Sequence, residues 1–188
     1  MRVHDDVVAR GKKTVIRRKR LADAADEYRW RSDPELAQYD ASRPVQVPFE
    51  NYLRNWNFDY RFTDMGGRSF AIEDESGRHI GNVMYYNIDQ SRGEAEIGIS
   101  IGERDYWSGG YGTDAIIALT RVLMARGDIL RLYLHTLDWN VRAQRAFQKA
   151  GFRTCGTSWR DARTFVVMEL WREQPVAPAA PAAPAVTA

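Results

Sequence analysis

The sequence predicts a mixed α/β domain, of the α+β kind, built on a mostly antiparallel central sheet. Two turn sequences separate three consecutive apolar runs at residues 69–73, 80–88 and 94–101, which predicts strands joined by hairpins. A glycine-rich bend at residues 105–115 then leads from the last run into a helical pattern. The 188 residues, 44% hydrophobic with six tryptophans, are enough for one domain with a substantial core.

The first half of the chain adds one strand and two helices. A first strand is expected around residues 14–16, inside the basic segment 12–20, which is either a solvated edge strand or a binding patch. Apolar residues at helical spacing predict a helix over 21–31, and the Ser-Asp-Pro sequence at 32–34 breaks the pattern. Aromatic residues at three- and four-residue steps predict a second helix over 48–58.

The second half continues the alternation of helices and strands. An amphipathic helix follows the bend and stops at Gly127, a residue suited to a left-handed cap. A buried strand is expected at 132–137 and a helix at 140–150. Residues 152–158 and 163–171 are predicted to form two closing strands.

We expect residues 1–174 to form a single domain and residues 175–188, which are alanine, proline and small residues, to form a disordered tail. The start of the chain lacks the apolar stretch of a signal peptide, and no segment is long enough to span a membrane. A cytoplasmic protein with no membrane partner is therefore expected.

Charge and cysteine content exclude several classes of site. The net charge of +2 is too small for a chain built to bind nucleic acid, so nucleic acid is an unlikely partner. The single cysteine excludes an intramolecular disulfide. No cysteine and histidine residues have zinc-like spacing, so no metal is expected.

The glycine-rich bend has the composition of a phosphate cradle. Gly109, Gly110 and Gly112 let backbone N–H groups approach an anion, and the positive end of the following helix points to the same place. The bend lacks the lysine and hydroxyl of a nucleoside triphosphate loop, and its spacing differs from a dinucleotide fingerprint. The alternative is a glycine bend that serves only to turn the chain.

A second motif lies at residues 140–152, which read NVRAQRAFQKAGF. Together the two motifs resemble the GNAT acyl-CoA N-acyltransferase superfamily, most closely the branch with the ribosomal-protein alanine and polyamine acetyltransferases. The resemblance is most specific over residues 94–152 and extends to most of the chain before Pro175. It implies about seven strands and about four helices, with the sheet splayed between the fourth and fifth strands. It also implies acetyl-CoA as co-substrate, with no metal.

The resemblance implies a set of coenzyme contacts. The bend would hold the pyrophosphate, exposed backbone groups of the preceding strand would pair with the pantetheine arm, and the second motif would face the coenzyme. The implied contacts are Ile99, Ser100, Ile101, Trp107, Ser108, Gly109, Gly110, Tyr111, Gly112, Thr113, Asn140 and Phe147. A backbone N–H on the strand, assigned to Ile101, would stabilise the oxyanion.

Two of these positions depart from the family pattern. Phe147 stands where many relatives carry a tyrosine whose hydroxyl protonates the leaving thiolate, so the general acid must be another group or water. Trp107 stands where much of the superfamily has arginine or glutamine, although the named branch often has tryptophan. Asn140 is also a good helix N-cap, and both of its roles can coexist.

Glu96 is the preferred general base. It alternates with apolar residues, which places it with Glu94 on the face opposite the core stripe. The alternative is a solvent-facing strand glutamate. Lesser candidates are Tyr85, Tyr86 and His135, the last of which also fits a core histidine with satisfied hydrogen bonds.

The leading hypothesis is an N-acetyltransferase in which a primary amine attacks acetyl-CoA directly in a ternary complex. The acceptor stays open: a protein N-terminus, a polyamine or an aminoglycoside. Aromatic and acidic residues at 35–59 either receive a cationic amine or pack as core with a solvated rim. The alternative class is a noncatalytic acyl-CoA-binding regulatory module, and a nucleic-acid-binding protein is the weakest option. A monomer or a homodimer is expected.

Overall fold

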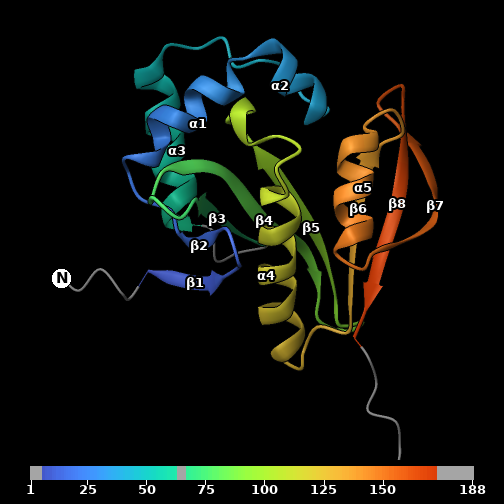
Figure 1. The fold of residues 1–188 in the computed structure, drawn as a ribbon. Helices are drawn as coiled ribbons and strands as arrows, with labels where there is room; N and C mark the ends of the chain where they lie inside the picture. The colour runs from blue at the N-terminus through green and yellow to red at the C-terminus, as the bar shows by residue number, and fades with distance from the viewer. Residues whose placement is uncertain (1–5, 63–66, 173–188) are drawn as a thin grey trace, which may run out of the picture.

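The computed structural model describes residues 6–62 and 67–172. These residues form one open, mostly antiparallel sheet of eight strands with five α-helices (Figure 1). The strands lie in the order β1-β2-β3-β4-β5-β6-β8-β7. Their bounds are β1 Val7–Arg10, β2 Val15–Arg18, β3 Gly67–Glu73, β4 His79–Asp89, β5 Glu94–Ile101, β6 Arg131–Leu137, β7 Arg153–Arg160 and β8 Arg163–Trp171. The helices are α1 Asp23–Arg31, α2 Pro34–Tyr39, α3 Phe49–Phe62, α4 Tyr111–Ala125 and α5 Val141–Lys149.

The predicted fold class is confirmed, but the count of seven strands misses β1. This strand has four residues and pairs with β2 through a tight hairpin. The hairpin turn is fixed by Asp114, whose carboxylate accepts hydrogen bonds from the N–H groups of Lys12, Lys13 and Thr14. A contact across about a hundred residues leaves no local sequence pattern, so only the second strand of the hairpin was visible.

The count of four helices misses α2, and the residues that end α1 explain why. Asp33 is the N-cap of α2, and its side chain accepts hydrogen bonds from the N–H groups of Glu35 and Leu36. Pro34 occupies the first turn, where a missing N–H costs nothing. The Asp-Pro pair that breaks one helix therefore begins the next.

The sheet splays between β5 and β6, as the resemblance implies for the fourth and fifth of the predicted strands. These two strands are parallel and pair only from Glu94 with Arg131 to Glu96 with Tyr133. Beyond these pairs they separate toward the end where α4 and α5 begin (Figure 1). The splay therefore opens a gap beside the N-termini of both helices.

The core lies where α4 covers the middle of the sheet. Ile97, Ile116, Leu119 and Leu132 are almost completely buried there, and burial of each such side chain contributes about 1.5–3 kcal/mol to folding. The core holds α4, and thus the bend before it, rigidly against β5. Among the described residues no helix is both long and apolar enough to cross a membrane. The predicted tail at 175–188 lies outside the described residues.

Candidate active site

The glycine-rich bend turns through two left-handed residues before α4. Ser108 has φ +60° and Gly110, the N-cap of α4, has φ +87°. A Cβ added at Gly110 would meet no atom within 4 Å, so glycine is needed for its backbone angle and the space in front of it is open. The first N–H groups of an α-helix have no partners inside the helix and carry its positive end. The bend therefore presents a concave row of donors.

The bend is fastened from behind by the β1–β2 hairpin. Asp114 in the first turn of α4 accepts four hydrogen bonds from Lys12, Lys13 and Thr14, between 2.8 and 3.0 Å. Partial burial works against its charge, but the N–H groups of Lys13 and Lys12 lower the pKa of the Asp114 carboxyl. Lys13 also donates from Nζ to the Gly109 carbonyl at 2.9 Å. The predicted basic segment thus braces the bend.

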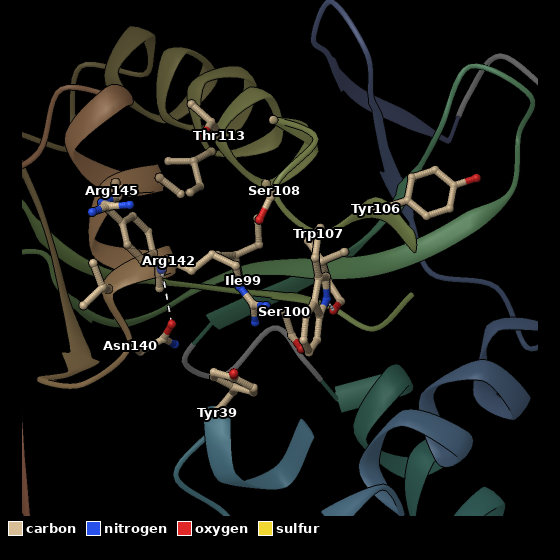
Figure 2. Close-up of a pocket in the computed structure, with 18 of the residues that line it drawn as sticks. Tyr39, Ile99, Ser100, Tyr106, Trp107, Ser108, Thr113, Asn140, Arg142 and Arg145 are labelled. Carbon is tan, nitrogen blue, oxygen red and sulfur yellow. Dashed lines mark hydrogen bonds between the residues drawn. The ribbon is translucent and has the colours of Figure 1, made fainter. Parts of the chain in front are cut away.

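A pocket of about 390 Å³ lies in front of the bend, bounded by β5, α4, α5 and the end of α2 (Figure 2). Most of the predicted coenzyme contacts line it: Ile99, Ser100, Ile101, Trp107, Ser108, Gly110, Gly112, Thr113, Asn140 and Phe147. Gly109 and Tyr111 do not line it. Tyr111 instead packs edge-on against Tyr106, with 4.9 Å between the ring centroids.

Three basic residues of α5 that are not among the predicted contacts also line the pocket: Arg142, Arg145 and Lys149. They recur at three- and four-residue steps, which places them on one face of the helix. This basic stripe was the signal that could have found them. It adds positive charge opposite the donor row, as a diphosphate requires.

Arg142 of α5 contacts two aromatic rings on the other side of the pocket, those of Trp107 and Tyr39. Its guanidinium lies 3.6 Å from the centroid of the Trp107 ring and 4.6 Å from that of Tyr39. The Trp107 indole in turn donates to the Ile101 carbonyl at 2.7 Å. Figure 2 shows Tyr39, Trp107 and Arg142 converging from three separate segments. Cation–π contacts of this kind hold the wall in place without a covalent link.

The strand register decides which backbone groups of β5 face the gap. The Gly102 N–H bonds to Ile80, and bonded pairs alternate along an antiparallel ladder, so the backbone groups of Ser100 point to Asn82 in β4. Those of Ile99 and Ile101 point the other way, into the gap. Ser100 reaches the pocket through its side chain instead.

Asn140 and Phe147 both belong to the pocket wall. The Asn140 side chain accepts a hydrogen bond from the Ala143 N–H at 3.2 Å, so it caps α5. Phe147 is 4% exposed and packs edge-on against Phe152, with 5.6 Å between the ring centroids. Its ring supplies an apolar surface and no proton.

Glu96 lies at the closed end of the gap, where β5 and β6 rejoin. It is 5% exposed, so the alternative of a solvent-facing glutamate is wrong. Its carboxylate accepts a hydrogen bond from Asn87 Nδ2 at 2.9 Å and lies 2.8 Å from His135 Nδ1. Burial and the neighbouring Glu96 carboxylate raise the pKa of Tyr86 to about 12. The buried Glu96 and the half-buried His135 therefore form a hydrogen-bonded pair at this end of the gap.

Asp40 stands at the opposite, open end of the pocket, beside Ser100. Asp40 is exposed on its outer side, yet it lines the pocket, where protein atoms crowd its carboxyl. This burial raises the pKa of its carboxyl to about 6, against the opposing effects of the Arg31 charge and a hydrogen bond from Ser100. Ser100, which bonds to Asp40, and Glu96 are four residues apart on one face of β5. The Asp40 carboxyl and the Glu96 carboxylate are therefore about 13 Å apart along the strand direction.

The residues around the bend fit a diphosphate. The donor row, the α4 N-terminus and the α5 basic stripe all direct positive charge into one pocket. Within residues 6–62 and 67–172, no group of three or more histidine, cysteine or acidic residues could hold a metal ion.

Comparison with known proteins identifies the fold. The family model described as acetyltransferase (GNAT) domain matches residues 13–153. An uncharacterized N-acetyltransferase p20 of Bacillus licheniformis is 29% identical over 103 residues, a match that covers 54% of this chain and 57% of that relative.

Solved structures share the fold at low sequence identity. Spermidine N-acetyltransferase of Vibrio cholerae, in complex with CoA and spermine, superposes with a TM-score of 0.75 at 18% identity, covering 85% of this chain and 95% of that one. Aminoglycoside acetyltransferase AAC(6')-Ib with coenzyme A gives 0.71 at 19% identity, with the same coverage. A GNAT-family acetyltransferase of Bacillus anthracis gives 0.74 at 16%, covering 88% and 99%.

Proposed function

Because the chain belongs to the GNAT acetyltransferase family, we propose that it is an N-acetyltransferase that moves an acetyl group from acetyl-CoA to a primary amine. One arrangement supports this proposal: the gap between β5 and β6 has the left-handed bend and the N-terminus of α4 at its open end, and the Glu96–His135 pair at its closed end. A pyrophosphate at the cradle and a thioester near Glu96 would span this length in the order that acetyl-CoA requires.

The coenzyme would be held mainly by backbone groups. The N–H groups of residues 109–113 would bind the pyrophosphate, with Arg142, Arg145 and Lys149 neutralising its charge. The pantetheine arm would lie along β5, where the backbone groups of Ile99 and Ile101 face the gap. An N–H of this row, on Ile101 in our assignment, would polarise the thioester carbonyl.

The acetyl transfer would proceed in a ternary complex. The nitrogen of the neutral amine attacks the carbonyl carbon, a C–N bond forms, and the C–S bond breaks to release the coenzyme thiolate. With Nδ1–H of His135 donating to Glu96, the neutral ring carries its lone pair on Nε2 and accepts the proton that the amine loses. Phe147 has no hydroxyl, so water returns a proton to the thiolate.

The test is release of free coenzyme thiol from acetyl-CoA in the presence of primary amines. The panel holds peptides with a free N-terminus, amino acids, amino sugars, a polyamine and an aminoglycoside. The proposal expects turnover with at least one class and the mass of the acetylated amine in the product. Tight coenzyme binding without turnover on any amine would contradict it.

Phe147 favours a second candidate, a noncatalytic module that binds acyl-CoA and regulates a partner, because the usual acid is missing at this position. The same assay separates the two. A module would bind acetyl-CoA and leave the thioester intact with every amine. Replacing Glu96 with glutamine would then alter neither the binding of acetyl-CoA nor the absence of cleavage.

A further inference from the structure

A second cavity, of about 740 Å³, lies between α1, α3 and the sheet. We call it the cationic cavity. Its lining comes from the end of β2, α1 and the residue between them, the connection between α2 and α3, α3 itself, and strands β3 and β4. The residues that define it are Arg18, Lys19, Glu27, Arg31, Arg43, Pro44, Val45, Gln46, Val47, Tyr52, Asn55, Trp56, Arg68, Ser69, Phe70 and Met84.

Within the part of the chain that the structure describes, the lining of the cavity has an excess of positive charge. Five of these lining residues are cationic and one, Glu27, is acidic. Glu27 is 5% exposed and already matched, because Lys19 Nζ lies 2.8 Å from its carboxylate and Trp56 Nε1 donates to it at 2.8 Å. Within the described residues, Arg18, Arg31 and Arg43 have no carboxylate within salt-bridge distance.

The cavity borders the proposed site of transfer at two points. Met84 in its lining lies opposite Gly98 in β5, and a Cβ on Gly98 would come 3.3 Å from the Met84 side chain. Side chains alternate along a strand, so Gly98 shares its face with Glu96 and Ser100. At the other point the charge of Arg31 acts on Asp40 in the coenzyme pocket. The cavity therefore lies on the same face of the sheet as Glu96 and Ser100.

We infer that the cationic cavity binds an anionic group, a carboxylate or a phosphate, on the amine acceptor. This inference rests on the proposed function and names its substrate class. Guanidinium groups bind carboxylate and phosphate oxygens in pairs, and the accessible Arg31 and Arg43 leave such pairs to be formed. Spermine and kanamycin, held by structures of the same fold, are polycations; a cavity with this charge repels them.

The test uses amines that differ only in the anion. Lysine is compared with cadaverine, O-phosphoethanolamine with ethanolamine, and glucosamine 6-phosphate with glucosamine, all at constant ionic strength. We expect at least one anionic member to exceed its partner about tenfold in kcat/KM; the first pair reports a carboxylate and the other two a phosphate. Equal or better turnover of every anion-free member, or of spermidine, would overturn the inference.

A charge reversal locates the effect. Arg43→Glu should remove the preference for the anionic amine while leaving coenzyme affinity within about twofold. Arg121→Glu is the matched control, because Arg121 is exposed on α4, which packs on Ile99 and Ile101 and so covers the opposite face of the sheet. A preference that survives Arg43→Glu and also Arg31→Glu would contradict the assignment.

A binding experiment separates failure of the inference from failure of the proposed function. Coenzyme A is added to saturation so that the cradle is filled, and inorganic phosphate and acetate are then titrated by calorimetry. Binding that is lost in Arg43→Glu and kept in Arg121→Glu supports an anion site even if no amine is acetylated. Absence of any anion binding, in a protein that does acetylate amines, would overturn the inference and leave the proposed function intact.

Discussion

The coenzyme pocket and the cationic cavity are built from different parts of the chain. The pocket depends on backbone: the left-handed Gly110, the first turn of α4, and the strand edge at Ile99 and Ile101. The cavity depends on side chains from α1, α3, three strands and a connecting segment. If the proposals hold, fixed backbone groups bind the acetyl donor and side chains select the acceptor. Substitutions in the pocket should therefore weaken coenzyme binding, and substitutions in the cavity should alter the choice of amine.

Glu96→Gln should slow acetyl transfer and leave coenzyme binding almost unchanged. The amide cannot hold His135 as a carboxylate does, so we expect kcat to fall about 10²- to 10⁴-fold. The dissociation constant of coenzyme A, measured by calorimetry, should change by less than about threefold. Wild-type kcat at every pH would show that another group takes the proton.

Gly110→Asp, by contrast, should abolish tight binding of coenzyme A. A side chain at φ +87° is strained, and its carboxylate would stand in the space that the pyrophosphate needs. We expect coenzyme affinity to drop about 100-fold or more. Gly77→Asp is the matched control, because Gly77 has φ +84° and open surroundings in the β3–β4 turn; it should bear the same strain and bind coenzyme normally. Equal losses in both variants would refute a direct role of the bend.

Asp114→Asn tests whether the brace behind the bend matters to binding. The carboxylate holds the hairpin through charged hydrogen bonds, so the variant should lose about 2 kcal/mol of unfolding free energy at pH 7. The pKa of Asp114 lies below its ordinary value of 3.8, so this contribution is complete above about pH 4 and is lost as pH falls through the lowered pKa. Denaturant unfolding of both proteins should therefore converge in acid, and coenzyme affinity should fall several-fold at pH 7.

Asp40→Asn should have the smallest effect and only over a limited pH range. The pKa of Asp40 is raised to about 6, so the folded state favours its neutral form, and the stability this provides is lost as pH rises from about 4 through 6. The asparagine variant stays neutral. Its melting temperature should match the wild type near pH 4 and exceed it by a few degrees above pH 6. If the difference in melting temperature between the two proteins stayed constant from pH 4 to above pH 6, the pKa of Asp40 would not be raised by its surroundings.

The same contrast explains what the sequence could predict. Glycines at 109, 110 and 112 mark a backbone-built site because only a few residue types suit its angles, so the bend was visible in one short segment. The cationic cavity escaped prediction because its arginines come from segments that only the fold brings together. β1 escaped for a similar reason, since Asp114 fixes its turn from a distant helix. The helical spacing of Arg142, Arg145 and Lys149 alone would predict the basic stripe on α5.

A crystal structure with coenzyme A bound would test the proposed coenzyme site most directly. We expect pyrophosphate oxygens about 3 Å from the N–H groups of residues 109–113, with the pantetheine arm beside Ile99 and Ile101 and the thiol directed toward Glu96. A pyrophosphate held by Arg142, Arg145 and Lys149 alone, away from those N–H groups, would contradict it.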